Sequence, residues 1–187
     1  MKAIKLIDNI YLIEDILDID NYPNLFDSVK VEASFDKPGR GGRKMRRMTD
    51  KGITYTLFGK KYGRKNYTET VLRIKKELEE KLPVNADYFN TCTLNYYNSG
   101  KCSFRDHTDK MPDLEQPMIV ATLTLGNSNR KMRLINRFTN IGYEVVLKHN
   151  SMLFMGPGMQ DIYLHGIPKE KNDVEPRLSL SFRRQKL

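Results

Sequence analysis

The sequence has little cysteine, little histidine and no tryptophan. Two cysteines, Cys92 and Cys102, are too few for a disulfide framework or a cysteine-based zinc site. We therefore expect two free thiols in a reducing intracellular compartment, either the nucleus or the cytoplasm. No apolar run approaches the ~20 residues that a membrane helix needs, so we expect no membrane partner. Without tryptophan, stacking on a ligand must come from tyrosine, phenylalanine or histidine.

The length and the charge distribution indicate the number of domains and the kind of binding partner. A chain of 187 residues has the size of one domain, so we expect 1–187 to form a single domain and a monomer. Lysine and arginine number 32 against 23 acids, a net charge of +9 that favours a polyanion such as nucleic acid as partner. The charge is uneven, because residues 37–65 hold eleven bases and a single acid.

This basic segment starts with several glycines, so its beginning suits neither a helix nor a central strand. Its bases are interleaved with Tyr55, Phe58 and Tyr62. A basic loop with aromatic side chains suits a nucleic-acid backbone and an unstacked base. The alternative is a solvated loop that is basic only for solubility.

Periodicity predicts an N-terminal α/β layer, one long helix and an all-β second half. Apolar residues at helical spacing predict a helix over 67–82, in which Asn66 and Glu69 form a capping box. A second helix is expected around 22–31. Short, partly alternating segments punctuated by turn residues indicate a sandwich or barrel. These segments are 91–97, 117–126, 131–136, 142–149, 151–156 and 177–183.

Two of the three histidines have spacing that suits metal binding. His107 and Asp109 are two residues apart, so in an extended segment they point to the same side. With His165 they make the two-histidine, one-carboxylate set of non-haem Fe(II) oxygenases. The alternative is a surface turn with a local hydrogen bond. His149 has no carboxylate at useful spacing and is interpreted as a turn residue.

The last predicted strand places two arginines on one face. Arg177 and Arg183 are six residues apart, and Ser179 lies between them on the same side. Buried arginines in an apolar β-domain need anions, either a bound dicarboxylate or structural Asp and Glu partners. Asn95 and Tyr97 share a strand face and can donate neutral hydrogen bonds to the same carboxylates.

Together these residues and their order resemble the AlkB family of Fe(II)/2-oxoglutarate dioxygenases. The blocks NYYNSGKCSFRDHTDK, IVATLTLG, SMLFMGPGMQDIYLHGIPK and PRLSLSFR carry the resemblance. Upstream, RRMTDKGITYTLFG is similar to the substrate lid of the DNA-repair members. The likeness covers roughly residues 40–184.

The resemblance implies an α+β, mainly β fold: a double-stranded β-helix, or jelly roll, with supporting helices. It implies an oxygenase that uses Fe(II), 2-oxoglutarate and O2, with His107, Asp109 and His165 as metal ligands and catalytic residues. Arg177 and Tyr97 are expected at the distal carboxylate of 2-oxoglutarate, and Arg183 and Asn95 at the end that chelates iron. The expected 2-oxoglutarate residues are Asn95, Tyr97, Arg177, Ser179 and Arg183.

For the substrate, the resemblance implies methylated bases of the 1-methyladenine and 3-methylcytosine type in DNA. Their oxidative demethylation releases formaldehyde, succinate and CO2, and a base inside a duplex must first be flipped out. The segment 37–65 is expected to form the lid. The expected substrate contacts are Arg46, Arg47, Tyr55, Leu57, Phe58 and Asp113.

The chain departs from the family pattern at three places that bear on the site. Ser179 stands where the repair enzymes usually have asparagine. Met111 stands four residues after the first ligand, where they commonly carry an acid that contacts the cationic base. Asp113 or Glu115 could replace that acid. The lid position expected to be aromatic aligns with Leu57, next to a phenylalanine.

Three other functions remain open at this point. The first is an RNA demethylase of the same family, because phosphate contacts do not distinguish RNA from DNA. The second is a 2-oxoglutarate oxygenase with another substrate, such as protein. The third is a nucleic-acid-binding module whose oxygenase site is inactive.

Overall fold

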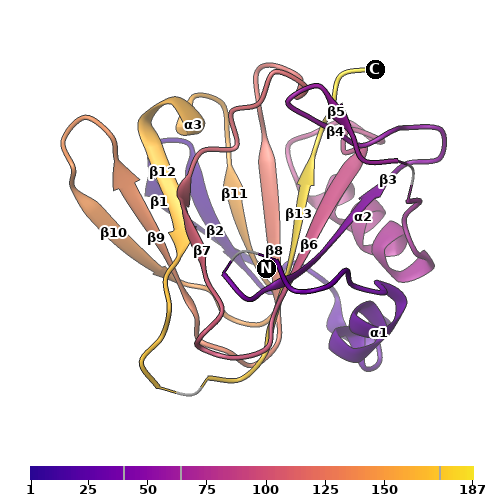
Figure 1. Cartoon of the computed structure of the whole chain (residues 1–187), viewed down its shortest axis with the longest axis horizontal. Coiled ribbons are helices and arrows are strands. Elements are labelled where there is room, and N and C mark those ends of the chain that lie inside the picture. Colours follow the sequence, from indigo (N-terminus) through magenta and orange to yellow (C-terminus); the bar gives the residue numbers. More distant parts are fainter. Residues whose placement is uncertain (40, 64, 173) are drawn as a thin grey trace.

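The computed structural model describes residues 1–39, 41–63, 65–172 and 174–187, and two antiparallel sheets form most of it (Figure 1). Arg40 and Arg64 of the predicted basic segment lie outside the described residues. The small sheet contains, in spatial order, β10 (Gly142–Val146), β9 (Lys131–Asn136), β12 (Tyr163–Ile167) and β7 (Phe104–His107). The large sheet contains β1 (Lys2–Ile7), β2 (Ile10–Glu14), β11 (Ser151–Met155), β8 (Val120–Leu125), β13 (Arg177–Arg183), β6 (Thr91–Tyr97) and β3 (Lys44–Thr49).

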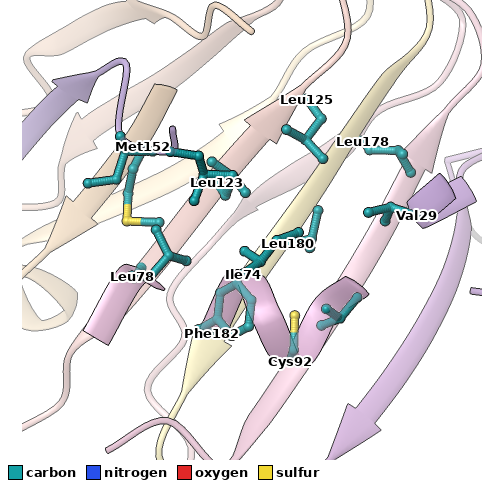
Figure 2. Close-up of a cluster of buried hydrophobic side chains, with 14 of the residues drawn as sticks. Val29, Ile74, Leu78, Cys92, Leu123, Leu125, Met152, Leu178, Leu180 and Phe182 are labelled. Atoms are coloured by element: carbon teal, nitrogen blue, oxygen red, sulfur yellow. The ribbon is translucent and has the colours of Figure 1, made fainter. Parts of the chain in front are cut away.

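Two helices, α1 (Leu25–Glu32) and α2 (Glu69–Lys81), cover the outer face of the large sheet (Figure 1). A short 3₁₀ turn, η1 (Ile19–Asn21), leads into α1. Figure 2 shows the core between this face and the helices, with Ile74 and Leu78 of α2 next to Leu180 and Phe182 of β13. Within the described residues, no helix is long and apolar enough to cross a membrane.

A second core lies between the two sheets. Leu12 and Leu153 of the large sheet belong to the same buried cluster as Leu134, Val145 and Ile167 of the small sheet. Side chains alternate across β13, so Leu178 and Leu180 enter the helix-side core while Arg177 and Ser179 face the small sheet. The core between the large sheet and the helices is therefore apolar. The core between the two sheets contains both apolar and polar side chains.

The sequence prediction of strands holds best where alternation is regular. The predicted 91–97, 131–136 and 177–183 coincide with β6, β9 and β13. The predicted 117–126 begins too early, since β8 starts at Val120, and 142–149 ends too late, since β10 stops at Val146. The prediction missed β7, because its residues, Phe-Arg-Asp-His, are mostly polar and only four long. Both cysteines are free and buried, as expected.

The basic segment is more ordered than the predicted loop. Its middle forms β3, an edge strand of the large sheet that pairs antiparallel with β6. A small hairpin follows, made of β4 (Thr56–Leu57) and β5 (Lys60–Lys61). The turn between them uses positive φ at Phe58 (50°) and Gly59 (73°), a conformation that favours glycine. We call residues 56–61 the lid hairpin.

The helix α2 begins two residues later than the predicted capping box requires. Its N-cap is Thr68, whose hydroxyl oxygen accepts a hydrogen bond from the Val71 N–H. The prediction of Asn66 as the cap was wrong, because the backbone of Asn66 forms a bridge with Thr49 of β3 instead. A long-range backbone contact thus sets where the helix starts.

Replacing Thr68 with alanine should lower the free energy of unfolding by about 1 kcal/mol, because one N-terminal N–H of α2 loses its acceptor. Urea unfolding of the purified protein measures the change. The matched control is Asn66→Ala, whose side chain is exposed and should cost markedly less. Equal losses of stability in the two variants would contradict the assignment of Thr68 as the cap of α2.

Candidate active site

A cavity of about 380 Å³ opens between the two sheets. Its inner wall consists of inward-facing side chains of β13 and β6, including Arg177 and Ser179. Residues of β7 and β12 form the facing wall. β3 and the lid hairpin supply the remaining lining. On the large sheet, strand alternation directs the polar side chains of β13 and β6 into this space.

Strand register brings the candidate metal ligands together. β12 pairs with β7 so that His165 lies opposite His107, and the two rings have centroids 4.3 Å apart. Asp109 follows β7 by two residues. One ligand atom from each of the three residues lies within 4.8 Å of the other two. The structure thus assembles the three residues that the His-x-Asp spacing singled out.

The orientation of the histidine rings leaves ring nitrogens available to an ion. His107 Nδ1 lies 2.9 Å from the carbonyl oxygen of Arg105, an arrangement in which Nδ1 donates and Nε2 stays free. His107 Nε2 is 3.6 Å from Asp109 Oδ1, and His165 Nε2 is 3.7 Å from Asp109 Oδ2. His165 Nδ1 is buried without a partner among the described residues. Two imidazoles and a carboxylate in this arrangement fit Fe(II).

The electrostatics keep Asp109 and His165 in the protonation states that a metal requires. Burial alone would raise the pKa of Asp109, but Arg183 and the two imidazoles outweigh it and hold the pKa well below its usual range. Burial lowers the pKa of His165 to about 4, although Asp109 opposes that shift. Near neutral pH the carboxylate is therefore ionised and the His165 imidazole is neutral.

The two predicted arginines differ sharply in their partners. Arg183 donates to Asp109 Oδ2 from Nη2 at 2.6 Å and from Nε at 3.2 Å. Arg177 is fully buried, and no described carboxylate lies within ion-pair distance of it. Its Nη2 donates to Thr124 Oγ1 at 3.0 Å, while Nε and Nη1 have no hydrogen-bond partner among the described residues.

A buried cation without an anion is the main unbalanced charge of the site. Burial lowers the pKa of Arg177 to about 10, so it still carries its charge near neutral pH. Its guanidinium carbon lies 5.3 Å from the centre of the Tyr97 ring, which partly compensates the burial. A carboxylate that reaches Nε and Nη1 would satisfy both orphan donors at once. The cavity therefore fits 2-oxoglutarate, with one carboxylate at Arg177 and the other end toward the triad.

Asn95 and Ser179 occupy the wall between Arg177 and the triad. They lie opposite each other in the β13–β6 register, and both line the cavity. Asn95 Oδ1 accepts a hydrogen bond from Arg43 Nε at 2.8 Å, and the Arg43 guanidinium lies 3.6 Å from the centre of the Phe104 ring. Arg43 was missed in the sequence, because nothing in its spacing separates it from the other bases of 37–65.

Gln160 is a second residue that sequence reasoning missed. It lies in the short helix α3 (Met159–Ile162) and is 4% exposed. Its Oε1 accepts a hydrogen bond from the backbone N–H of Asp109 at 2.8 Å. The side chain therefore fixes the backbone that carries the central metal ligand. The contact joins residues 51 positions apart, so no local pattern could reveal it.

The predicted substrate residues fall into two groups. Arg47, Tyr55, Leu57 and Phe58 line the cavity. Arg46 and Asp113 do not line it. Arg46 lies 3.7 Å from Asp36, and the Asp113 carboxylate accepts the Gly59 N–H of the lid turn at 3.2 and 3.3 Å. The structure thus places Asp113 as a support of the lid hairpin.

Comparison with known proteins identifies the family. The model of the 2OG-Fe(II) oxygenase superfamily matches residues 29–183. The chain belongs to this superfamily. Among solved structures, the oxygenase fold matches OsALKBH1 with a TM-score of 0.67 at 17% identity, over 98% of this chain and all of that one. A prolyl-4-hydroxylase of Pseudomonas putida matches with a TM-score of 0.61 at 16% identity, over 95% and 94% of the two chains. These matches confirm the jelly roll.

Curated relatives place the oxygenase in the AlkB family. It is 29% identical over 122 residues to the alpha-ketoglutarate-dependent dioxygenase alkB homolog 3 of Bos taurus, covering 60% of this chain and 41% of that protein. It is 25% identical over 150 residues to the DNA oxidative demethylase ALKBH2 of Mus musculus, covering 76% and 61%. The chain thus spans about two to three fifths of the length of these relatives.

Family and geometry agree on the cofactors of this AlkB-family oxygenase. The superfamily is one of Fe(II)- and 2-oxoglutarate-dependent oxygenases, and the three-residue metal site of this chain fits that chemistry. His107, Asp109 and His165 are placed to hold the metal, and Arg177 is placed to hold the cosubstrate. The protein's contribution is to orient these groups within one cavity.

Arg177→Met should raise the 2-oxoglutarate concentration needed for half-maximal turnover by about 30-fold or more, because a buried carboxylate loses its cation. The free energy of unfolding should not fall, since methionine removes an incompletely bonded buried charge. Succinate formation at a range of 2-oxoglutarate concentrations measures the first effect, and urea unfolding the second. An unchanged requirement would place the carboxylate elsewhere.

Gln160→Met should weaken Fe(II) binding about tenfold, because the Asp109 backbone loses the acceptor that fixes it. Anaerobic Fe(II) titration, repeated with Mn(II), reports affinity separately from turnover. The control is Ile162→Ala in the same short helix, whose side chain is 37% exposed and should leave affinity unchanged. Equal affinities for Gln160→Met and the parent would remove its positioning role.

Proposed function

We propose that this oxygenase removes N-methyl groups from nucleic-acid bases, with DNA bases of the 1-methyladenine and 3-methylcytosine type as substrates. Iron and 2-oxoglutarate, when bound, supply the oxidising chemistry, in which O2 and 2-oxoglutarate are consumed and succinate and CO2 are formed. The N-methyl carbon gains one oxygen atom. The C–N bond of the resulting hemiaminal then breaks: its electron pair returns to the base nitrogen, the hydroxyl proton passes to water, and formaldehyde is released.

The observation that carries the proposal is the basic, aromatic lid hairpin next to the triad. Phe58 lines the cavity and is 69% exposed, so a flat base entering the cavity can stack on it. The Arg47 guanidinium lies 4.4 Å from the centre of the Tyr62 ring. Lys60 and Lys61 are exposed on the same hairpin. Stacking surfaces beside positive charges suit a flipped base and its phosphates.

The remainder of the cavity supports a bulky, planar substrate. Tyr55 donates or accepts a hydrogen bond with Thr93 Oγ1 at 3.1 Å, which holds its ring against the cavity wall. Met45, Met111 and Met132 add polarisable apolar surface to the lining. The names of the AlkB relatives, a DNA oxidative demethylase among them, also support this reading.

The test is turnover on oligonucleotides that carry a single 1-methyladenine or 3-methylcytosine. We expect one methyl group lost for each formaldehyde released, with succinate formed in parallel, on single- or double-stranded DNA. His165→Ala should abolish methyl loss, because a three-residue metal site has no spare ligand. Mass spectrometry of the oligonucleotide and quantification of succinate supply both readouts.

Matched RNA oligonucleotides discriminate the alternatives. Faster methyl loss from RNA would move the substrate from DNA to RNA, a choice that phosphate contacts do not make. Succinate without methyl loss from any oligonucleotide would refute nucleic-acid demethylation and direct the search to other substrates. Oligonucleotide binding without succinate in iron-loaded protein would favour a binding module.

A further inference from the structure

A second, smaller cavity of about 130 Å³ lies beside β3, at the outer edge of the large sheet. β3 is the last strand of this sheet and pairs on one side with β6 (Figure 1). We call this space the edge cavity. It is lined by Asp36, Arg46, Arg47, Tyr55, Tyr62, Gly63 and Lys65. Arg47 and Tyr55 also line the larger cavity, so these two side chains form a wall that both spaces share.

The backbone of β3 has a hydrogen-bonding gap beside the edge cavity. In an antiparallel pair, alternate residues direct their N–H and C=O away from the partner strand. The Met45 carbonyl oxygen points outward, because it accepts the Asp36 N–H at 3.0 Å. The Thr49 N–H also points outward and donates to the Lys65 carbonyl oxygen at 2.8 Å. Arg47 lies between these two residues, so its N–H and C=O face the same edge. Among the described residues, neither has a backbone partner there.

The size of this gap limits what can fill it. Asp36 covers the strand edge on one side of the gap, and Lys65 covers it on the other. An extended peptide that adds to a sheet needs several consecutive free backbone groups. The gap at β3 is a single residue wide, so it does not fit an added strand. It fits a compact group that accepts hydrogen bonds.

The charges around the edge cavity favour an anion. Arg46, Arg47 and Lys65 supply three cations against one acid, Asp36. The Asp36 side chain is 60% exposed and lies 3.7 Å from Arg46 Nη1, so it neutralises little of this charge. Arg46 Nε is buried and has no hydrogen-bond partner among the described residues. A compact anion would meet guanidinium donors and the free Arg47 N–H in one place.

Aromatic contacts hold the shared cation in position. The Arg47 guanidinium lies 4.4 Å from the centre of the Tyr62 ring and 5.5 Å from that of Tyr55. The two rings meet edge to face, and the Tyr62 N–H donates to the Tyr55 carbonyl oxygen at 2.8 Å. In a nucleic-acid strand, one sugar separates each phosphate from its base. A strand whose base enters the larger cavity can therefore place a phosphate on the other side of this wall.

We propose that the edge cavity binds one backbone phosphate of the nucleic-acid strand whose base enters the larger cavity. The inference rests on the proposed function, because it assigns a second contact to the same substrate. Arg46 and the Arg47 N–H hold the phosphate oxygens, and Lys65 adds charge. Arg46, which the sequence predicted as a substrate contact, thus binds the strand while the larger cavity receives the base. Such a site fixes one particular linkage, whereas a diffuse basic surface would attract all linkages alike.

The sharpest test neutralises the phosphates of a substrate one at a time. A single-stranded DNA oligonucleotide with one 3-methylcytosine is made with an uncharged methylphosphonate at each linkage in turn. Binding to the parent protein, loaded with Fe(II) without oxygen, is measured by fluorescence anisotropy. We expect one linkage near the methylated base to lose about tenfold in affinity, because it loses charge-assisted hydrogen bonds. The other linkages should lose about twofold or less.

The variant Arg46→Met assigns that linkage to the edge cavity. It should weaken binding of the all-phosphate oligonucleotide about tenfold and make the slope of log affinity against log salt shallower by about 0.7. Methylphosphonate at the sensitive linkage should then cost nothing further. The control is Lys2→Met, which removes an exposed charge on β1, the opposite edge strand, and should keep the affinity and the slope. Additive losses from Arg46→Met and the methylphosphonate would overturn the assignment.

The remaining outcomes separate this inference from the proposed function. Equal losses at every linkage, with methyl groups still removed, would refute the phosphate site alone. With such equal losses, an inorganic phosphate effect on the parent's Tm that Arg46→Met abolishes would assign the edge cavity to free phosphate and also overturn the inference. One sensitive linkage without methyl loss would refute the proposed function and leave the phosphate site standing. The scan uses the parent protein, so a misfolded Arg46→Met would not block the test.

Discussion

A buried ion pair between Arg183 and Asp109 joins the two sheets of this oxygenase at its reactive centre. Arg183 lies on β13, an interior strand of the large sheet, and Asp109 follows β7, an edge strand of the small sheet. Removing both charges from water is costly, and the two hydrogen bonds between them offset that cost. The pair keeps the carboxylate ionised. It thereby also keeps the triad able to bind a cation.

The two arginines of β13 share one face but have different roles. Arg183 is neutralised within the protein, whereas Arg177 is buried with two unpartnered donors. A dicarboxylate entering the cavity therefore meets one cation that is already paired and one that still needs an anion. A bound 2-oxoglutarate would satisfy Arg177 with its distal carboxylate and direct its other end toward the triad. The energetic imbalance at Arg177 is thus removed when the cosubstrate binds.

The buried and the exposed basic side chains of the molecule have different roles. Inside, two arginines serve an acid and a cosubstrate. On β3 and the lid hairpin, arginine and lysine lie beside tyrosine and phenylalanine, where a polyanion can approach. Between these regions, the described lining has no carboxylate beyond the metal ligand. The proposed nucleic-acid substrate would meet the exposed positive charge of β3 and the lid hairpin before its base reached the cavity.

Features that depend on local periodicity could be predicted from the sequence. Strand alternation places Arg177, Ser179 and Arg183 on one face, and two-residue spacing brings His107 and Asp109 to one side. The order of these motifs along the chain indicates the family and, through it, the jelly roll. Such features follow from backbone geometry over a few residues, so neighbouring sequence is enough to predict them.

Contacts between residues that are distant in sequence could be identified only from the folded structure. In the structure the N-cap of α2 is Thr68 and not the predicted Asn66. Asp113, predicted to contact the base, binds the lid turn instead. Gln160 accepts a hydrogen bond from the Asp109 backbone. Each outcome depends on a contact between segments that are distant in sequence or on competition between nearby groups for one partner. Local periodicity carries no information about either, because both depend on how the two sheets and the lid hairpin pack together.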